Sequence, residues 1–576
     1  MAGKEVHFEI FRRQGAKGGW TLHEVVRERV VAIRTAEELF KGGGATGVKI
    51  IKETYDSDSG DYLSLKIYEE GHNSARVEPA AEDVPHALPC FKPDDLYSYH
   101  ARATMTRLLS DWLARNKLTI TELTHRADAL EKLEATGTVY QHAIQKVAVA
   151  QASSTTTPVQ QIVKSLNDLA TKAMNQVYRD EHKKVFAVLN AGQFGAYAAE
   201  QGDGPGARYL LNGAVAKYLA DAKGWEEKLK RLLALMDEIP DEGPGQTLLL
   251  GAVDSLCAEM LGGSAAITDL LGGSTDLGAA LTRLVKLFMG APSEGEPCAL
   301  DVLARHFAKD ELSEARTAIA NRILAELKST KRLCPSSMED ELKMLRKLAN
   351  ELVHGQGKYL SHENLIAAFT LRSRRLVSHE FIGQLLDGAE APETKLERLL
   401  LVEENIIGAE NKRILASFVT PLIASPNFAN AFVYASTPAF LRLQKLATLQ
   451  TRVLRSGFQD IPRAEIARAL DDVASQAEAR GKILESLAAK SANPVEAAQA
   501  LLKLFLAPAI TEGTLSAKAR KMLLAAVGRP GFFTGYANGL AKAGGPTDPQ
   551  VAMTELMGQL EKAGVPPEDA ATAIAA

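Results

Sequence analysis

Three aspartates in a short polar segment form a pattern that could bind a metal ion. Asp56, Asp58 and Asp61 lie within the run Asp-Ser-Asp-Ser-Gly-Asp, and clustered carboxylate oxygens are the ligands that calcium prefers. A calcium loop of the EF-hand type needs a glutamate at its twelfth position, where this sequence has Ile67. The same residue types favour a tight turn between two strands. Two alternatives therefore stand here, a calcium site and a hairpin turn.

Two Ser-His-Glu triplets, centred on His362 and His379, are candidates for phosphoryl transfer. The triplet at His379, followed by Phe381, is similar to the start of the phosphoacceptor box of sensor histidine kinases, in which a helical histidine takes the phosphate and the adjacent acid assists. The Arg-Thr-Pro that continues that box is replaced by Ile-Gly-Gln, and no glycine-rich ATP-binding box follows. His379 and His362 are the candidate phosphoacceptors. The alternative for both triplets is a serine helix cap with an acid in the first turn.

A basic cluster offers a third kind of site. Arg372, Arg374 and Arg375 lie beside Thr370 and Ser373. Guanidinium groups bind phosphate and carboxylate oxygens through paired hydrogen bonds, so the cluster could meet an anion or an acidic partner helix. The alternative is a solvated helix face.

The remaining motif candidates are weaker. The glycine-rich run 42–49 resembles a phosphate-binding loop, but Val48 separates its last glycine from Lys49, and the run leads from a helix into a strand, the reverse of such a loop. A helix end followed by a turn is the preferred interpretation. Catalytic triads are defined by geometry, and the sequence nominates no catalytic residue and no cofactor.

The first seventy residues have the pattern of a small α+β module. Apolar and polar residues alternate as in strands, whereas one segment has helical spacing and ends at three glycines. The resulting prediction is a ββαββ module over 1–70, with strands at 5–10, 20–26, 47–54 and 62–68 and a helix at 29–41.

A linker separates this module from a helical remainder. Residues 71–93 carry four prolines and no sustained periodicity. Beyond them apolar residues recur at helical spacing in almost every segment. We therefore expect a mainly α protein, divided into a helical domain at 94–200, a helical hairpin array at 201–390, and C-terminal helical hairpin repeats at 391–576.

A weak internal repeat supports the hairpin interpretation. Residues 228–233 parallel 395–400, and 501–506 form a looser third copy. Each copy is followed by a glycine-containing turn and a second apolar helix. Stacked helix pairs of this kind bury a continuous core and leave a long surface for partners. Because the intervals between copies are unequal, a plain helical bundle remains the alternative.

Composition limits the class of protein. The chain of 576 residues is 46% hydrophobic and 24% charged, with a formal net charge of −4. The hydrophobic and charged fractions are typical of globular domains. The small negative net charge argues against nucleic-acid binding by the whole chain. Four widely spaced cysteines (Cys90, Cys257, Cys298 and Cys334) predict reduced thiols. Neither a signal peptide nor eighteen consecutive apolar residues occur, so we expect a cytoplasmic protein without membrane insertion. The alanine-rich, cysteine-poor composition is typical of bacterial proteins, and we expect a bacterial origin.

These observations favour a non-enzymatic adaptor or scaffold that binds other proteins through grooves between helices. No partner can be named from the sequence, and self-association is one form that the binding could take. Three alternatives stand beside it: a phospho-signalling protein that receives phosphate on a helical histidine, a regulator that responds to a small ligand, and a self-assembling structural protein.

Overall fold

The computed structural model describes residues 6–14, 20–56, 61–71, 88–152, 155, 157–204, 206–273, 276–292, 298–355, 357–389, 391–489, 493–507 and 509–575. The chain divides into two compact units, Met1–Ala87 and Leu88–Ala576. Each is described by itself below. The further division at 201 and 391 stays a prediction.

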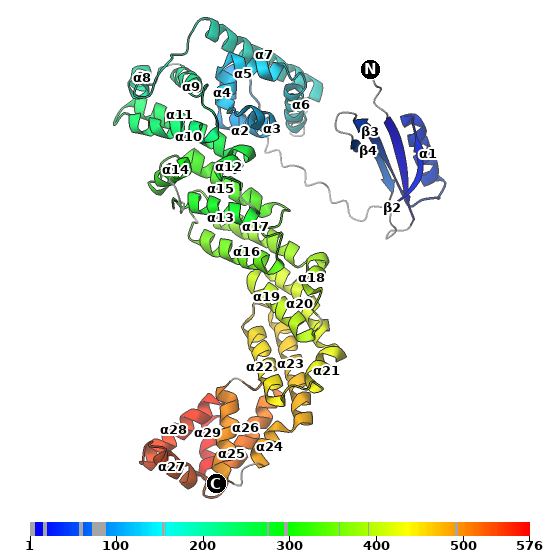
Figure 1. Cartoon of the computed structure of the whole chain (residues 1–576), viewed down its shortest axis with the longest axis vertical. Coiled ribbons are helices and arrows are strands. Elements are labelled where there is room, and N and C mark those ends of the chain that lie inside the picture. Colours follow the sequence, from blue (N-terminus) through cyan, green and yellow to red (C-terminus); the bar gives the residue numbers. More distant parts are fainter. Residues whose placement is uncertain are drawn as a thin grey trace. The chain divides into compact units, whose positions relative to one another are not determined.

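The first unit is a four-stranded antiparallel sheet with one helix (Figure 1). Its elements are β1 (Val6–Arg13), β2 (Trp20–Val26), α1 (Arg29–Lys41), β3 (Gly47–Asp56) and β4 (Asp61–Gly71). The strands lie in the order β2-β1-β3-β4, which confirms the predicted ββαββ module.

Helix α1 covers one face of the sheet. Ile10 of β1 lies opposite Ile50 of β3 in the ladder, and both side chains are fully buried in one core with Ala32 and Ala36 of α1. Successive strand residues point to opposite faces, so the alternating pattern places these apolar side chains together. The two alanines sit four residues apart on one helix face, and their small size lets α1 approach the strands closely.

The predicted calcium loop joins two neighbouring strands. Asp56 of β3 is paired with Asp61 of β4 in the antiparallel ladder, which is the connection that a hairpin turn makes. Asp58 and the rest of 57–60 lie outside the described residues, as do the side chains of Asp56 and Asp61. The calcium alternative therefore stays a prediction.

The second unit is helical throughout its described residues (Figure 1). It begins with η1 (Pro93–Tyr97), α2 (Tyr99–Leu108), α3 (Ser110–Asn116), α4 (Ile120–His125), α5 (Ala127–Glu134), α6 (Val139–Ala152) and α7 (Val159–His182). It continues with α8 (Phe194–Gln201), α9 (Ala207–Tyr218), α10 (Trp225–Ala234), η2 (Leu235–Glu238), α11 (Pro244–Gly262), α12 (Ser264–Leu270), α13 (Leu277–Phe288), α14 (Ala299–Ala308), α15 (Ser313–Lys328), α16 (Met338–Val353), α17 (His362–Leu376) and α18 (His379–Leu386). It ends with α19 (Pro392–Asn405), α20 (Ala409–Ile423), α21 (Pro426–Val433), α22 (Ala439–Arg455), α23 (Asp460–Gly481), α24 (Ile483–Ala489), α25 (Pro494–Leu506), α26 (Thr514–Val527), α27 (Phe532–Lys542), α28 (Pro549–Lys562) and α29 (Pro567–Ala575).

Successive helix pairs pack on one another along this unit. Helix α11 contacts α15, α13 contacts α16, α16 contacts α19, α19 contacts α22, and α23 contacts α26, which in turn contacts α29. One continuous apolar core runs from Phe194 to Ala570, and a smaller core from Leu109 to Val177 belongs to the first helices. The mainly α hairpin array predicted from the sequence is confirmed.

The three copies of the sequence repeat all form helix pairs. Residues 228–233, 395–400 and 501–506 lie in α10, α19 and α25, and the second helices are α11, α20 and α26. Gly243, Gly408 and Gly513 directly precede those second helices with φ angles of 90°, 103° and 139°. This region of backbone space favours glycine. A side chain at Gly513 would also collide with Asp471.

Within the described residues, no single helix is long and apolar enough to cross a bilayer. Helices α11 and α12 reach that length and composition only when taken together, and their axes are bent by 93°. The four cysteines are free thiols, as their spacing predicts.

Candidate functional site

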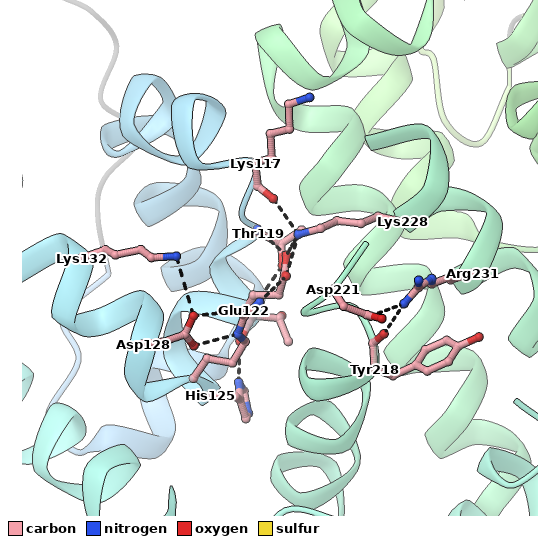
Figure 2. Close-up of polar contacts among 12 residues, drawn as sticks. Lys117, Thr119, Glu122, His125, Asp128, Lys132, Tyr218, Asp221, Lys228 and Arg231 are labelled. Carbon is pink, nitrogen blue, oxygen red and sulfur yellow. Dashed lines mark hydrogen bonds and ion pairs between the residues drawn. The ribbon is translucent and has the colours of Figure 1, made fainter. Parts of the chain in front are cut away.

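A buried ion pair joins α4 to α10 (Figure 2). Lys228 places its Nζ atom 2.6 and 2.7 Å from the two carboxylate oxygens of Glu122, and it donates a third hydrogen bond of 2.6 Å to the carbonyl oxygen of Lys117. The two side chains are 3% and 0% exposed. Burial lowers the pKa of Lys228, and the adjacent carboxylate acts in the opposite direction. All three donors of the ammonium group are used.

Glu122 is also bonded within its own helix. The backbone N–H of Thr119 donates to Glu122 Oε2 at 3.0 Å, and the Thr119 hydroxyl accepts from the backbone N–H of Glu122 at 3.1 Å. This reciprocal arrangement is a capping box, which satisfies amides at the start of a helix. Arg126 Nη1 donates to Glu122 Oε1 at 3.1 Å. Both oxygens of the buried carboxylate are therefore engaged.

A second buried acid holds the first turn of α4. Glu259 of α11 accepts hydrogen bonds from the backbone N–H and the hydroxyl of Thr121 at 2.9 and 2.8 Å. It also accepts from Arg102 Nη1 of α2 at 2.9 Å. Burial raises the pKa of Glu259, and Arg102 opposes that shift. Together, Glu122 and Glu259 fix α4 to α2, α10 and α11.

His125 ends α4 inside an aromatic cluster. Its ring centroid lies 5.2 Å from that of Tyr97, 4.9 Å from that of Tyr209 and 5.8 Å from that of Phe186. His125 Nδ1 lies 2.7 Å from the carbonyl oxygen of Thr121, so this nitrogen carries the proton, and Nε2 has no hydrogen-bond partner among the described residues. Burial lowers the pKa of His125 to about 4, which keeps the ring neutral near pH 7.

The geometry around Glu122 and Lys228 suits a structural joint better than a reaction centre. A general base or nucleophile needs an atom that can reach a substrate. Here the carboxylate and the ammonium group are nearly inaccessible to solvent. They bond to each other, to the Arg126 guanidinium and to the carbonyl oxygen of Lys117. Breaking such a pair on one side costs several kcal/mol.

The predicted arginine cluster is divided between two faces of α17. Arg372 is 3% exposed, and its guanidinium donates to the carbonyl oxygens of Leu327 and Glu326 at 2.8 Å each. Arg375 donates to the carbonyl oxygens of Lys328 and Ser329. These two arginines therefore cap the carboxyl end of α15. Arg374 is exposed, and it is the only one of the three predicted residues that is.

Arginine capping recurs along the array and was not anticipated from the sequence. Four more arginines donate a hydrogen bond to a carbonyl oxygen near the end of another helix: Arg231 to Tyr218, Arg398 to Leu385, Arg442 to Val433 and Arg520 to Ala563. Positive side chains at these ends satisfy unpaired carbonyl groups and the helix dipole. Arg231 and Arg398 occupy the same position of the sequence repeat, and each reaches a carbonyl thirteen residues earlier. This shared contact strengthens the relation between the two copies.

Both candidate phosphoacceptors stand at the first position of a helix. The Ser361 hydroxyl accepts from the backbone N–H of Asn364, and the Ser378 hydroxyl accepts from that of Phe381, at 3.2 Å in each case. The predicted serine caps are therefore confirmed. His379 is exposed and packs edge-on against Phe418 with 4.9 Å between ring centroids. Helix α17 begins at His362 and α18 at His379, so the structure does not bring the two histidines together in one helix.

An open groove lies between α16 and α19. Its volume is about 520 Å³, and it is lined by Lys343, Arg346, Lys347, Asn350, Glu351, Leu401, Glu404 and Asn405. Arg346 Nη1 donates to the backbone carbonyl of Glu404 at 3.3 Å, and the Glu404 carboxylate receives Arg452 of α22 at 2.9 Å. Lys343 has no ion pair in the described part of the chain. The helical spacing of the basic residues is visible in the sequence, but the neighbour that completes the groove is not.

No family model, no curated protein and no solved structure matches this chain. Among the described residues, no group of three histidine, cysteine, aspartate or glutamate side chains is placed to bind a metal ion. The open groove is the candidate site that the following proposal uses.

Proposed function

We propose that the helical unit is a protein-binding scaffold, and that the groove between α16 and α19 receives an acidic helical or extended segment of a partner. The observation that carries this proposal is the row of exposed basic side chains along the groove. Lys343 and Lys347 are one helical turn apart and both exposed, so they lie on one side of α16. Arg346, also exposed, bonds to a carbonyl oxygen and not to a carboxylate.

The local balance of charge favours an acidic partner. Glu351 lies 3.9 Å from Lys347, and Glu404 pairs with Arg452. Lys343 and Arg346 make no ion pair with an acidic side chain among the described residues, so their charges are available to a partner. Complementary charge raises the rate of association and suppresses wrong partners. Leu401 adds an apolar surface of the kind that one face of an amphipathic helix covers.

The test places a photoreactive amino acid at Asn350, an exposed residue that lines the groove. A partner crosslinked there in cells and identified by mass spectrometry is then purified, and its affinity is measured with full-length protein. The double substitution Lys343→Glu with Lys347→Glu should weaken binding at least tenfold. The wild-type affinity should fall as salt is raised, because exposed charges are screened.

The matched control is Lys503→Glu with Lys521→Glu, which makes the same change of charge on exposed positions of α25 and α26. It should leave the affinity unchanged. Equal affinity of the wild-type protein and the α16 variant, or an equal loss in the control variant, would contradict the proposal.

A further inference from the structure

A group of exposed apolar side chains lies where α21 leads into α22. Tyr434 follows the last residue of α21 and is 63% exposed, and Phe440 and Leu441, in the first turn of α22, are 39% and 53% exposed. The core of the array is built from other positions of α22, which include Leu443 and Leu446. The three side chains thus leave much of their apolar surface in water, and large apolar side chains grouped on a surface mark sites of interaction.

The end of α23 lies beside these residues, because α21 and α22 both pack on α23 (Figure 1). The Arg480 guanidinium lies over the Tyr434 ring, 4.3 Å from the ring centroid. A Cβ atom at Gly481 would come within 3.0 Å of the Cβ atom of Ala439, the first residue of α22. Segments 434–441 and 480–482 therefore form one surface. We call it the α22 patch and define it by five residues: Tyr434, Phe440, Leu441, Arg480 and Lys482.

The rim of the α22 patch carries positive charge. Arg480 and Lys482 are both exposed, and neither makes an ion pair in the described part of the chain. A guanidinium that stacks on a ring keeps its charge, and the donors on its edge can still meet a carboxylate. The acids nearest in sequence do not compensate these charges: Glu478 is buried and accepts from two backbone amides, and Glu485 lies 3.7 Å from Lys518.

Charge also decides which occupant the α22 patch fits. A second copy related by a two-fold axis would place the cations of one patch against those of the other, because such an interface joins the same surface of both subunits. Anionic membrane surfaces are recognised by clusters of about four to eight basic residues, whereas this rim has Arg480 and Lys482. An acidic protein segment with an apolar anchor matches both the charge of the rim and the apolar centre.

We propose that the α22 patch binds a short acidic segment of a partner protein. An aromatic or leucine side chain of that segment packs on Tyr434 and Leu441, and its carboxylates pair with Arg480 and Lys482. Tyrosine and arginine are among the side chains that contribute most to the affinity of protein interfaces. The inference rests on the scaffold function proposed above, and it adds a second surface on helices other than α16 and α19.

The experiment selects peptides from a displayed library of short random sequences on the immobilised full-length chain. The affinity of the enriched sequences is then measured with synthetic peptides. We expect the enriched peptides to combine an aromatic residue or leucine with aspartate or glutamate. Tyr434→Ala and Leu441→Asp should each weaken their binding at least tenfold. The double substitution Arg480→Gln with Lys482→Gln should weaken binding at low salt and remove most of its salt dependence, because exposed charges are screened by salt.

Leu454→Asp is the matched control, since Leu454 is 44% exposed at the opposite end of α22. It should leave the peptide affinity unchanged. The groove variant, Lys343→Glu with Lys347→Glu, should also bind the peptides normally, so failure of the α16–α19 groove and failure of the α22 patch give different results. Enrichment of no peptide, enrichment of peptides without acidic residues, or equal affinity of the wild type and the patch variants would overturn the proposal.

Discussion

The buried pair between α4 and α10 makes a strong prediction about local stability. Lys228→Met removes the ammonium group but keeps an unbranched apolar side chain of similar length. The Glu122 carboxylate, 0% exposed, then loses the partner that bonds both of its oxygens. Removing one partner of a buried pair costs about 3–5 kcal/mol. Arg126 remains 3.1 Å from Oε1, so we expect the lower end, about 3 kcal/mol.

Hydrogen exchange followed by mass spectrometry measures this loss where it occurs. A cost of about 3 kcal/mol corresponds to a roughly 100-fold increase in local opening. Amides of α4 and of the first turn of α10 should exchange faster by about that factor, whereas those of α25 and α26 should not change. Exchange suits this protein better than a global unfolding midpoint, because a chain with several cores need not unfold in one step.

Two further variants separate the charge effect from a packing effect. Adding Glu122→Gln to Lys228→Met removes the unpaired charge and should recover at least half of the lost protection. Lys230→Met changes a neighbouring lysine whose ion pair with Glu226 is mostly exposed, and it should have no measurable effect. Wild-type exchange rates in Lys228→Met, or no recovery in the double variant, would refute the reasoning.

Two other predictions follow from buried groups. Arg372→Ala should lower stability by about 3 kcal/mol, because it uncaps α15 and leaves the buried Glu341 carboxylate with Arg332 at 3.9 Å as its remaining arginine, whereas Arg374→Ala should leave the melting temperature unchanged. For His125, the folded pKa of about 4 lies below the ordinary value of 6.5, so the unfolded chain binds more protons and stability should fall as pH decreases from about 6.5 toward 4, by on the order of 3 kcal/mol. His125→Gln should remove that pH dependence of the urea midpoint; parallel profiles for the two proteins would contradict the assignment.

Local elements could be predicted from the sequence because short-range spacing determines them. The helix expected at 29–41 is α1 over the same residues, and the serine caps before His362 and His379 are confirmed. Both features depend on residues within one or two helical turns of each other. The strand expected at 47–54 extends two residues further, to Asp56, since pairing with β4 continues to the turn.

The candidate site depends on contacts that the sequence does not display. Glu122 and Lys228 are 106 residues apart, and no local pattern relates them. For the arginine cluster, helical spacing already places Arg372 and Arg375 on one face and Arg374 on another. What the sequence could not reveal is that the face of Arg372 is the buried one, because that depends on α15 lying against α17.

The buried polar contacts bear on binding because they determine where the groove residues stand. Apolar contacts between leucine and alanine side chains are non-directional, and many helix registers satisfy them. The hydrogen bonds of a capped helix end or of a buried ion pair form in only one register of the two helices. Glu341, which Arg372 approaches and which accepts from the backbone N–H of Cys334 at 2.7 Å, lies in the same helix as Lys343. The lysines that we propose to meet a partner are thus positioned by a carboxylate on the opposite, buried side of α16. Loss of Arg372 should therefore weaken partner binding at the groove without removing any residue that lines it.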